Sequence, residues 1–171
     1  MRVDQEVAAQ CCELPEQSRV LVAYSGGVDS HVLLHALAQY AQTVPTIALR
    51  AIHVNHQLHP DSASWASHCQ QVCSDLSLPI AVVDVDLQLK PGQSTEALAR
   101  EARYAAIAQH MLPGEVVMTA QHQEDQAETL LLQLMRGAGV KGLAAMPVTK
   151  DFGVGRLMRP LLQLSQQDIL T

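Results

Sequence analysis

The sequence predicts an α/β fold, an open parallel sheet with helices on both faces. Short runs rich in Val, Ile and Leu alternate with longer amphipathic stretches along the chain. Each short run is continuously apolar at its centre, as in a parallel strand that is covered on both faces. With 171 residues, of which 48% are hydrophobic, the chain is long enough for one domain with a filled core.

Strands and helices are predicted in alternation after a first helix. The predicted strands are Arg19–Tyr24, Thr46–Val54, Ile80–Asp84 and Glu115–Ala120. The predicted helices cover about Val3–Leu14, Ser30–Ala41, Ser62–Leu76, Ser94–Met111 and Glu124–Met135. The apolar run of Leu130, Leu131, Leu132 and Leu134 is expected to pack in the core.

The end of the chain carries a helix start signal. Ser165-Gln166-Gln167-Asp168 fits a capping box, so a helix is predicted to begin there. Because a natural domain rarely ends one turn into a helix, we expect residues 1–171 to be one domain cut from a longer protein, with a short terminal helix as the alternative.

Composition, cysteine pattern and net charge restrict the expected cellular compartment and binding partners. No run of residues resembles a signal peptide or a membrane span. The four cysteines form neither a CxxC motif nor a disulfide framework, so free thiols in the cytoplasm are expected. The net charge of −6 does not point to a nucleic-acid binder, but all of it lies in residues 1–89. A polyanion would therefore dock more readily on the later half.

The strongest local pattern is an apolar strand that runs into a Gly-Gly turn and then a helix. Val20–Tyr24 precedes Ser25-Gly26-Gly27-Val28-Asp29-Ser30. Two glycines let the backbone approach a ligand, and a helix N-terminus offers unpaired N–H groups. The pattern predicts a phosphate-binding loop with added hydroxyl donors from Ser25 and Ser30.

The acidic Asp29 inside this loop indicates a cation. A carboxylate would repel phosphate unless Mg²⁺ lay between them. The loop is neither a Walker A motif nor a GxGxxG fingerprint, because the required spacings are absent. The alternative is a plain turn in which Asp29 only caps a helix.

A second motif, Ile52-His53-Val54-Asn55-His56, closes the second predicted strand. Ligands of open parallel sheets bind beyond the carboxyl ends of the strands, so this segment should border the same crevice. The alternatives are metal binding by His53, His56 and His59, or no role.

Two later segments carry charges at helical spacing. Glu96, Arg100 and Arg103 fall on one helix face, where arginines can clamp phosphates; a solvated stripe of ion pairs is the alternative. Asp125 and Glu128 share a face where the fourth strand passes into a helix. Simple capping explains one or two acidic residues there, but not their coincidence with a strand end and a histidine.

The motifs together resemble a known family. SGGVDS matches the PP-loop of the ATP pyrophosphatases. With HVNHQL, EALAREARY, HQEDQAET, RGAG and RPLL in this order, the chain closely resembles the N-terminal catalytic domain of the tRNA(Ile)-lysidine synthetases over about residues 18–165. The resemblance implies a PP-loop (adenine nucleotide alpha hydrolase-like) Rossmann-type fold.

The resemblance also implies a reaction and its partners. Such enzymes use ATP and Mg²⁺ to adenylate C2 of the wobble cytidine in an isoleucine tRNA with a CAU anticodon. L-lysine then displaces AMP. The family grips its tRNA through C-terminal domains, so this chain alone is expected to bind ATP but to modify tRNA poorly. The oligomeric state, including a homodimer, stays open.

Residue roles follow from the same resemblance. Ser25, Gly26, Gly27, Asp29 and Ser30 are expected to hold the phosphates, with Asp29 positioning the metal.

The second strand end, with His53 and Val54, is expected to support the adenosine. Asp29, Arg100 and Asp125 are expected to be catalytic. Arg103, His122 and Glu128 are expected to contact substrate, with Glu128 binding lysine. For His122 the alternative is that it only packs.

One position departs from the family pattern. Glu124 stands where relatives often carry Asp, and its longer side chain argues against a direct metal role. Two other functions remain as alternatives. One is a tRNA thiolase, which typically needs catalytic cysteines near the ATP motifs. The other is a non-catalytic nucleotide-binding module, which the intact acidic and basic residues argue against.

Overall fold

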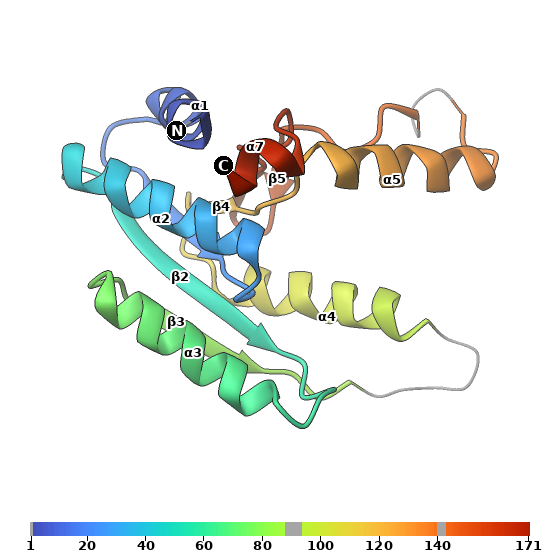
Figure 1. Ribbon diagram of the computed structural model, residues 1–171, viewed down its shortest axis with the longest axis horizontal. Helices are drawn as coiled ribbons and strands as arrows, with labels where there is room; N and C mark the ends of the chain where they lie inside the picture. Colours follow the sequence, from blue (N-terminus) through green and yellow to red (C-terminus); the bar gives the residue numbers. More distant parts are fainter. Residues whose placement is uncertain (1, 88–93, 140–142) are drawn as a thin grey trace.

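The computed structural model describes residues 2–87, 94–139 and 143–171 (Figure 1). Its centre is a six-stranded sheet with the order β3-β2-β1-β4-β6-β5. The strands are β1 (Arg19–Ala23), β2 (Ala48–Asn55), β3 (Ile80–Asp84), β4 (Val116–Met118), β5 (Thr149–Phe152) and β6 (Gly155–Met158).

The predicted parallel sheet is confirmed at its centre, and one edge differs. Strands β3, β2, β1, β4 and β6 run parallel, whereas β5 pairs antiparallel with β6. The β5–β6 hairpin is absent from the sequence prediction because Thr149–Phe152 is short and largely polar. Charged side chains such as Lys150 suit an edge strand, because they discourage pairing with another chain.

The described helices agree with the prediction, and every shared helix or strand boundary differs by no more than two residues. The helices are α1 (Arg2–Cys12), α2 (Val28–Thr43), α3 (Ser62–Asp75), α4 (Thr95–His110), α5 (Gln123–Met135) and α7 (Gln166–Leu170). The predicted capping box at the start of α7 is present, with Asp168 Oδ2 accepting from the Ser165 N–H at 3.0 Å. Among the described residues, no helix is long and apolar enough to cross a membrane.

Helices cover both faces of the sheet, as the sequence predicts (Figure 1). Val20 and Val22 of β1 pack into a large cluster with residues of α1, α2, α3 and α7. The intervening Leu21 packs on the opposite face, with Ile107 of α4. The alternation follows from the period of two in a strand, and it explains why β1 is apolar throughout.

Helix α5 corrects one prediction. The leucine run was expected in the core, but Leu131 is 60% exposed, Leu132 43% and Leu134 51%, and Leu130 is only partly buried. None of the helix's residues is fully buried. In Figure 1, α5 extends away from the sheet toward one side of the molecule.

A buried ion pair ties β2 to the start of β4. Glu115 is 1% exposed and accepts from Arg50 Nε at 2.8 Å and from Arg50 Nη2 at 2.7 Å. Its Oε2 also accepts from the Leu112 N–H at 2.9 Å. Such a bidentate geometry fixes the spacing of two segments that are distant in sequence.

Candidate active site

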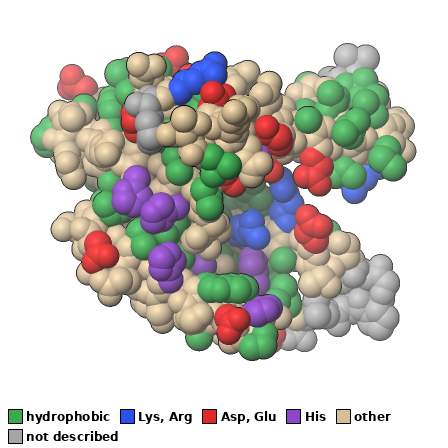
Figure 2. All heavy atoms as spheres, in the orientation of Figure 1, with side chains coloured by type: hydrophobic (Ala, Val, Ile, Leu, Met, Phe, Trp, Pro, Cys, Tyr) green, Lys and Arg blue, Asp and Glu red, His purple; other side chains and the backbone are tan. Residues whose placement is uncertain are grey.

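A large cleft opens at the end of the sheet between β1 and β4, where the sequence order of the strands changes direction. Strands β2 and β3 lie on one side of β1, and β4 and β6 lie on the other, so the loops that leave β1 and β4 diverge. The cleft has a volume of about 960 Å³ and is lined from the ends of β1, β2 and β4 and from α2, α3, α4 and α5. Figure 2 shows this hollowed face, with Lys or Arg side chains inside the hollow and His side chains near it.

The phosphate loop is held in shape by its own serines. Ser25 Oγ and Ser30 Oγ lie 2.9 Å apart, and Ser30 Oγ donates to the Gly27 carbonyl oxygen at 2.9 Å. Gly26 has a φ of +86°, which favours glycine. Gly27 is the N-cap of α2 and has no side chain that could occupy the N–H groups of the first turn. These donors are therefore free to meet an anion.

Asp29 lies in the first turn of α2 and faces the cleft. Its side chain is 34% exposed, yet its Oδ1 atom is buried and has no hydrogen-bond partner. Its other oxygen, Oδ2, lies 3.8 Å from His122 Nε2. An unpartnered buried carboxylate oxygen is costly, so the arrangement suits a cation supplied with a ligand.

His122 lies close to Asp29 and contacts the two acidic residues that follow it at the start of α5. Asp125 Oδ2 accepts from the His122 N–H at 2.9 Å and lies 3.6 Å from His122 Nε2. His122 Nδ1 lies 2.9 Å from Glu124 Oε2. Desolvation alone would raise the pKa of Glu124, but hydrogen bonds from the N–H of Gln166, from its own N–H and from His122 outweigh it and lower that pKa. Three carboxylates therefore surround one buried imidazole.

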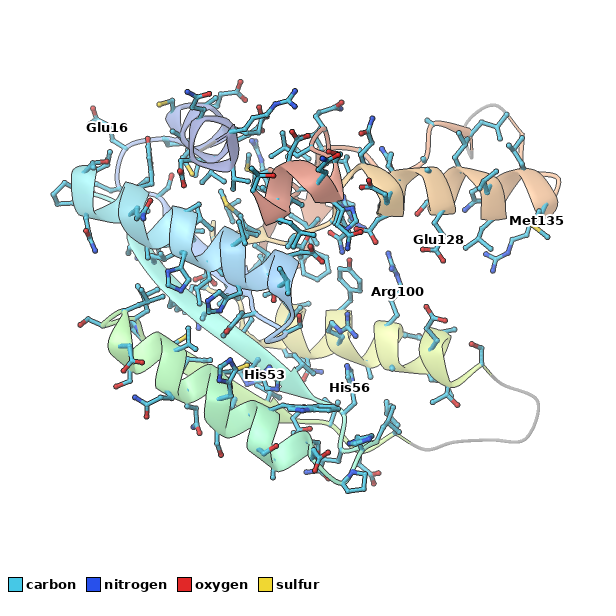
Figure 3. All side chains as sticks on the ribbon, viewed as in Figure 1. Glu16, His53, His56, Arg100, Glu128 and Met135 are labelled. Carbon is cyan, nitrogen blue, oxygen red and sulfur yellow. The ribbon has the colours of Figure 1, made fainter. Side chains whose placement is uncertain are left out.

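Opposite charges face each other across the cleft. Figure 3 shows Glu128 of α5 and Arg100 of α4 pointing toward one another from the two helices. The guanidinium of Arg100 lies over the ring of Tyr104, 5.4 Å from its centroid, which supports it from below. We call the side with Arg100 and Arg103 the α4 wall and the side with Asp125 and Glu128 the α5 wall. Glu96 also lines the first and Arg136 the second, and the two walls can receive ligand groups of opposite charge.

Arg103 is held by a histidine of the second motif. Its Nε donates to His56 Nε2 at 3.3 Å, from α4 to the loop after β2. Burial, then Arg103 and His53, lowers the pKa of His56, so the neutral ring that accepts this bond is favoured.

His53 supports the loop from beneath. It is 6% exposed, and its Nδ1 lies 2.9 Å from the Tyr24 carbonyl oxygen and 3.4 Å from Cys69 Sγ. His59 stacks on Trp65 instead, with ring centroids 4.9 Å apart. In the described part of the chain, no three His, Cys, Asp or Glu side chains are grouped to hold a metal, so the metal alternative for these histidines is not supported.

The structure brings most of the predicted site residues to one cleft. Those that line it are Ser25, Gly27, Asp29, Ser30, His53, Val54, Arg100, Arg103, Asp125 and Glu128. Gly26 and His122 do not line it: Gly26 packs against Cys69, and His122 lies behind Asp29 and Asp125.

Sequence reasoning missed several aromatic residues of the cleft. Trp65, which is 50% exposed at the start of α3, and Tyr104 on α4 both line it. An aromatic residue in a chain with only five of them was the available signal.

None of the four cysteines lines the cleft. Cys69 and Cys73 are fully buried, and burial raises the pKa of each thiol to about 11. Cys69 is distant in sequence from the phosphate loop but lies directly beneath Gly26 in space. A buried thiol with such a pKa is a poor nucleophile.

Comparison with known proteins relates the cleft to a family. The model of the PP-loop domain family matches residues 2–171. The tRNA(Ile)-lysidine synthase of Coxiella burnetii is 50% identical over 156 residues, which are 91% of this chain and 34% of that protein. The enzyme of the same name from Escherichia coli O157:H7 is 47% identical over 157 residues, 92% of this chain and 36% of that protein. The chain thus spans about a third of the length of these curated relatives.

Solved structures share the fold at low sequence identity. A U34-tRNA thiolase from Methanococcus maripaludis superposes with a TM-score of 0.76 at 18% identity, covering 99% of this chain and 60% of that one. An NMN synthetase from Francisella tularensis superposes with a TM-score of 0.57 at 12% identity, covering 98% of this chain and 65% of that one. These similarities support the fold alone.

Proposed function

The chain belongs to the PP-loop domain family, and from this premise we propose that it binds ATP in the cleft and adenylates a tRNA base. The observation that carries the proposal is the free first turn of α2 above a glycine loop, with Asp29 inside it. The N–H groups and the serine hydroxyls of the loop would receive the phosphates. The segment around His53 and Val54 would border the adenosine.

Asp29 fits a Mg²⁺ ion. The ion commonly takes one or two carboxylates together with substrate phosphates, and the unpartnered Oδ1 of Asp29 would be one such ligand. Bound there, Mg²⁺ would neutralise charge between the phosphates and the carboxylate. Asp125 lies near the same nitrogen of His122 as Asp29 does, and its charge would add to that of Asp29.

The substrates are proposed from the relatives and from the two charged walls. The relatives are tRNA(Ile)-lysidine synthases, so we propose isoleucine tRNA with a CAU anticodon and L-lysine as substrates. Arg100 and Arg103 on the α4 wall would attract phosphates of ATP or tRNA. Glu128 on the α5 wall would attract the ammonium group of lysine.

The chemistry needs positioning more than proton transfer. The C2 oxygen of the cytidine attacks the α-phosphorus of ATP, and pyrophosphate leaves. The lysine amine then attacks C2, AMP leaves with the C2 oxygen, and the amine loses a proton. In this scheme the loop and Arg100 hold the phosphates, while Glu128 orients lysine.

The relatives' additional length has a consequence for the proposal. Their remaining two thirds or so would supply most of the tRNA contacts, so the 171-residue chain would bind ATP but modify tRNA poorly. We place the reaction in the cytoplasm, where its thiols stay reduced.

The alternatives receive less support. A thiolase mechanism would need a reactive cysteine, but Cys69 is buried with a raised pKa. A non-catalytic nucleotide-binding module would have no need for Asp29, Asp125 and Glu128 together around the cleft.

The test measures AMP and pyrophosphate formed from ATP with Mg²⁺, L-lysine and the CAU-anticodon tRNA, using a protein of the relatives' length that carries these residues. We expect turnover to need both lysine and that tRNA, and Asp29→Asn and Asp125→Asn to abolish it. Glu101→Gln, an exposed carboxylate outside the cleft, is the matched control. Turnover that is independent of lysine would remove the ligation step from the proposal while keeping adenylation.

A further inference from the structure

Glu124 turns away from the cleft and links the N-cap residue of its own helix to α7. Its Oε2 lies 2.9 Å from His122 Nδ1 and accepts from the Gln166 N–H, also at 2.9 Å. Gln166 is the first residue of α7, which follows the N-cap Ser165. One carboxylate oxygen therefore links the start of α7 to the imidazole behind the acidic wall.

The chemistry of this contact fixes a proton. An ionised carboxylate can only accept hydrogen bonds, so the 2.9 Å contact requires a proton on His122 Nδ1. Without Glu124, the preference would reverse, because Nε2 lies 3.8 Å from Asp29 and 3.6 Å from Asp125, and both carboxylates attract a proton to that nitrogen. The His122 side chain is 9% exposed, so water cannot readily replace a lost partner.

We propose that Glu124 is a positioning residue that acts through His122. It keeps a proton on Nδ1 and the ring in one orientation, so that Nε2 stays between Asp29 and Asp125. The Gln166 N–H in turn holds the Glu124 oxygen in place. A partner of this kind behind a site residue commonly fixes both tautomer and orientation.

The length of the Glu124 side chain allows it to make both contacts. An aspartate at position 124 would end about 1.5 Å, one carbon–carbon bond, nearer the backbone. It would lose at least one of the two 2.9 Å contacts. Glu124 therefore has a function that does not require metal binding, and it does not line the cleft.

Long-range ¹⁵N–¹H NMR of the ligand-free 171-residue chain reads the tautomer directly. At about pH 8, where free histidine is neutral, we expect a protonated Nδ1 on His122. Glu124→Ala should shift the proton to Nε2. Glu124→Gln should keep Nδ1 protonated, because the Gln166 N–H holds the amide oxygen in the position of Oε2.

A second variant separates the two hydrogen bonds. Gln166→Pro removes the N–H together with the glutamine side chain, at a first helical position that tolerates proline after the extended Ser165 (ψ 158°). Alone, it should leave Nδ1 protonated, because the carboxylate still only accepts. Combined with Glu124→Gln, it frees the amide to flip and donate to Nδ1, so the proton should move to Nε2. Gln166→Ala with Glu124→Gln is the matched control and should not move it.

An unprotonated Nδ1 in the parent chain, or an unchanged tautomer in both Glu124→Ala and the double proline variant, would overturn the proposal.

The consequence for ligand binding rests on the proposed function: Glu124→Ala should weaken ATP binding with Mg²⁺ about 10–100-fold, and Glu124→Gln much less. If the parent chain binds no ATP, the proposed function fails while the tautomer result still stands. If Glu124→Ala changes the tautomer of His122 but leaves the ATP affinity unchanged, Glu124 does not position His122 for ATP binding.

Discussion

Gly26 is the position at which a single methyl group should damage both the fold and the site. It adopts a φ of +86°, and an added Cβ would lie 3.0 Å from Cys69 Sγ. Cys69 is fully buried, and its Sγ also lies 3.4 Å from His53 Nδ1. The thiol therefore cannot move aside without disturbing the histidine beneath the loop.

The loss of stability expected in Gly26→Ala has two parts. A left-handed backbone costs a residue with a Cβ roughly 1–2 kcal/mol. Overpacking a filled core costs typically 1–3 kcal/mol more. The free energy of unfolding should therefore fall by about 2–5 kcal/mol, or roughly 4–20 °C in Tm for a domain of this size.

A double-mutant cycle separates the two parts. Cys69→Ala removes the sulfur that the new methyl group meets, so Gly26→Ala should cost only about 1–2 kcal/mol in that background. Urea unfolding at constant m-value measures each free energy. Gly139→Ala is the matched control, because no atom of the described residues lies within 4 Å of its added Cβ and its φ is not left-handed.

Two outcomes would contradict this account of Gly26. If Gly26→Ala unfolds within about 0.5 kcal/mol of the parent, the loop does not hold Gly26 in the left-handed region. If Cys69→Ala gives no relief, the contact with the thiol is not the source of the packing cost. Isothermal titration with ATP on the same variants then reports whether the loop shape matters for the nucleotide.

Three further measurements test other parts of the structure. Arg50→Met should cost about 3–5 kcal/mol in urea unfolding because it leaves the Glu115 carboxylate buried and unpaired, and replacing both residues with apolar ones should cost less. Leu131→Lys with Leu134→Glu should leave the free energy of unfolding unchanged while reducing aggregation in light scattering, since both side chains are exposed. Burial, and then two neighbouring histidines, lowers the pKa of His31, so the unfolded chain binds the extra proton first and stability should fall as pH drops below about 6.5. His31→Gln should flatten that slope, and an unchanged slope would contradict the assignment.

Much of the fold is predictable because the central strands bury both faces. Val20, Leu21 and Val22 are apolar on alternate sides because helices cover both faces of the sheet, and that pattern is visible in the sequence. The β5–β6 hairpin lacks this signal, since an edge strand needs no continuous apolar run. The leucines of α5 show the opposite limit: an apolar run predicts burial, but it does not identify what buries it.

The meeting of distant motifs in one cleft is predictable from the sheet alone. Parallel strands bring their carboxyl ends to one edge, so the loop after β1 and the segment after β4 meet there. Side-chain direction is not predictable in this way. Glu124, Asp125 and Glu128 lie within one helical turn or so, yet Glu124 turns toward α7 while the other two line the cleft.

The net charge of the whole chain is a poor guide to this site. It is −6, yet Arg100 and Arg103 lie together on α4 and line the cleft, where Glu96 is the acidic residue of the same helix that also lines it. Under the proposed function, the negative charge around Asp29 would repel ATP unless a cation entered with it, whereas the same charge would attract a lysine ammonium group to Glu128. One cleft can therefore admit an anionic and a cationic substrate, provided that each approaches its own wall.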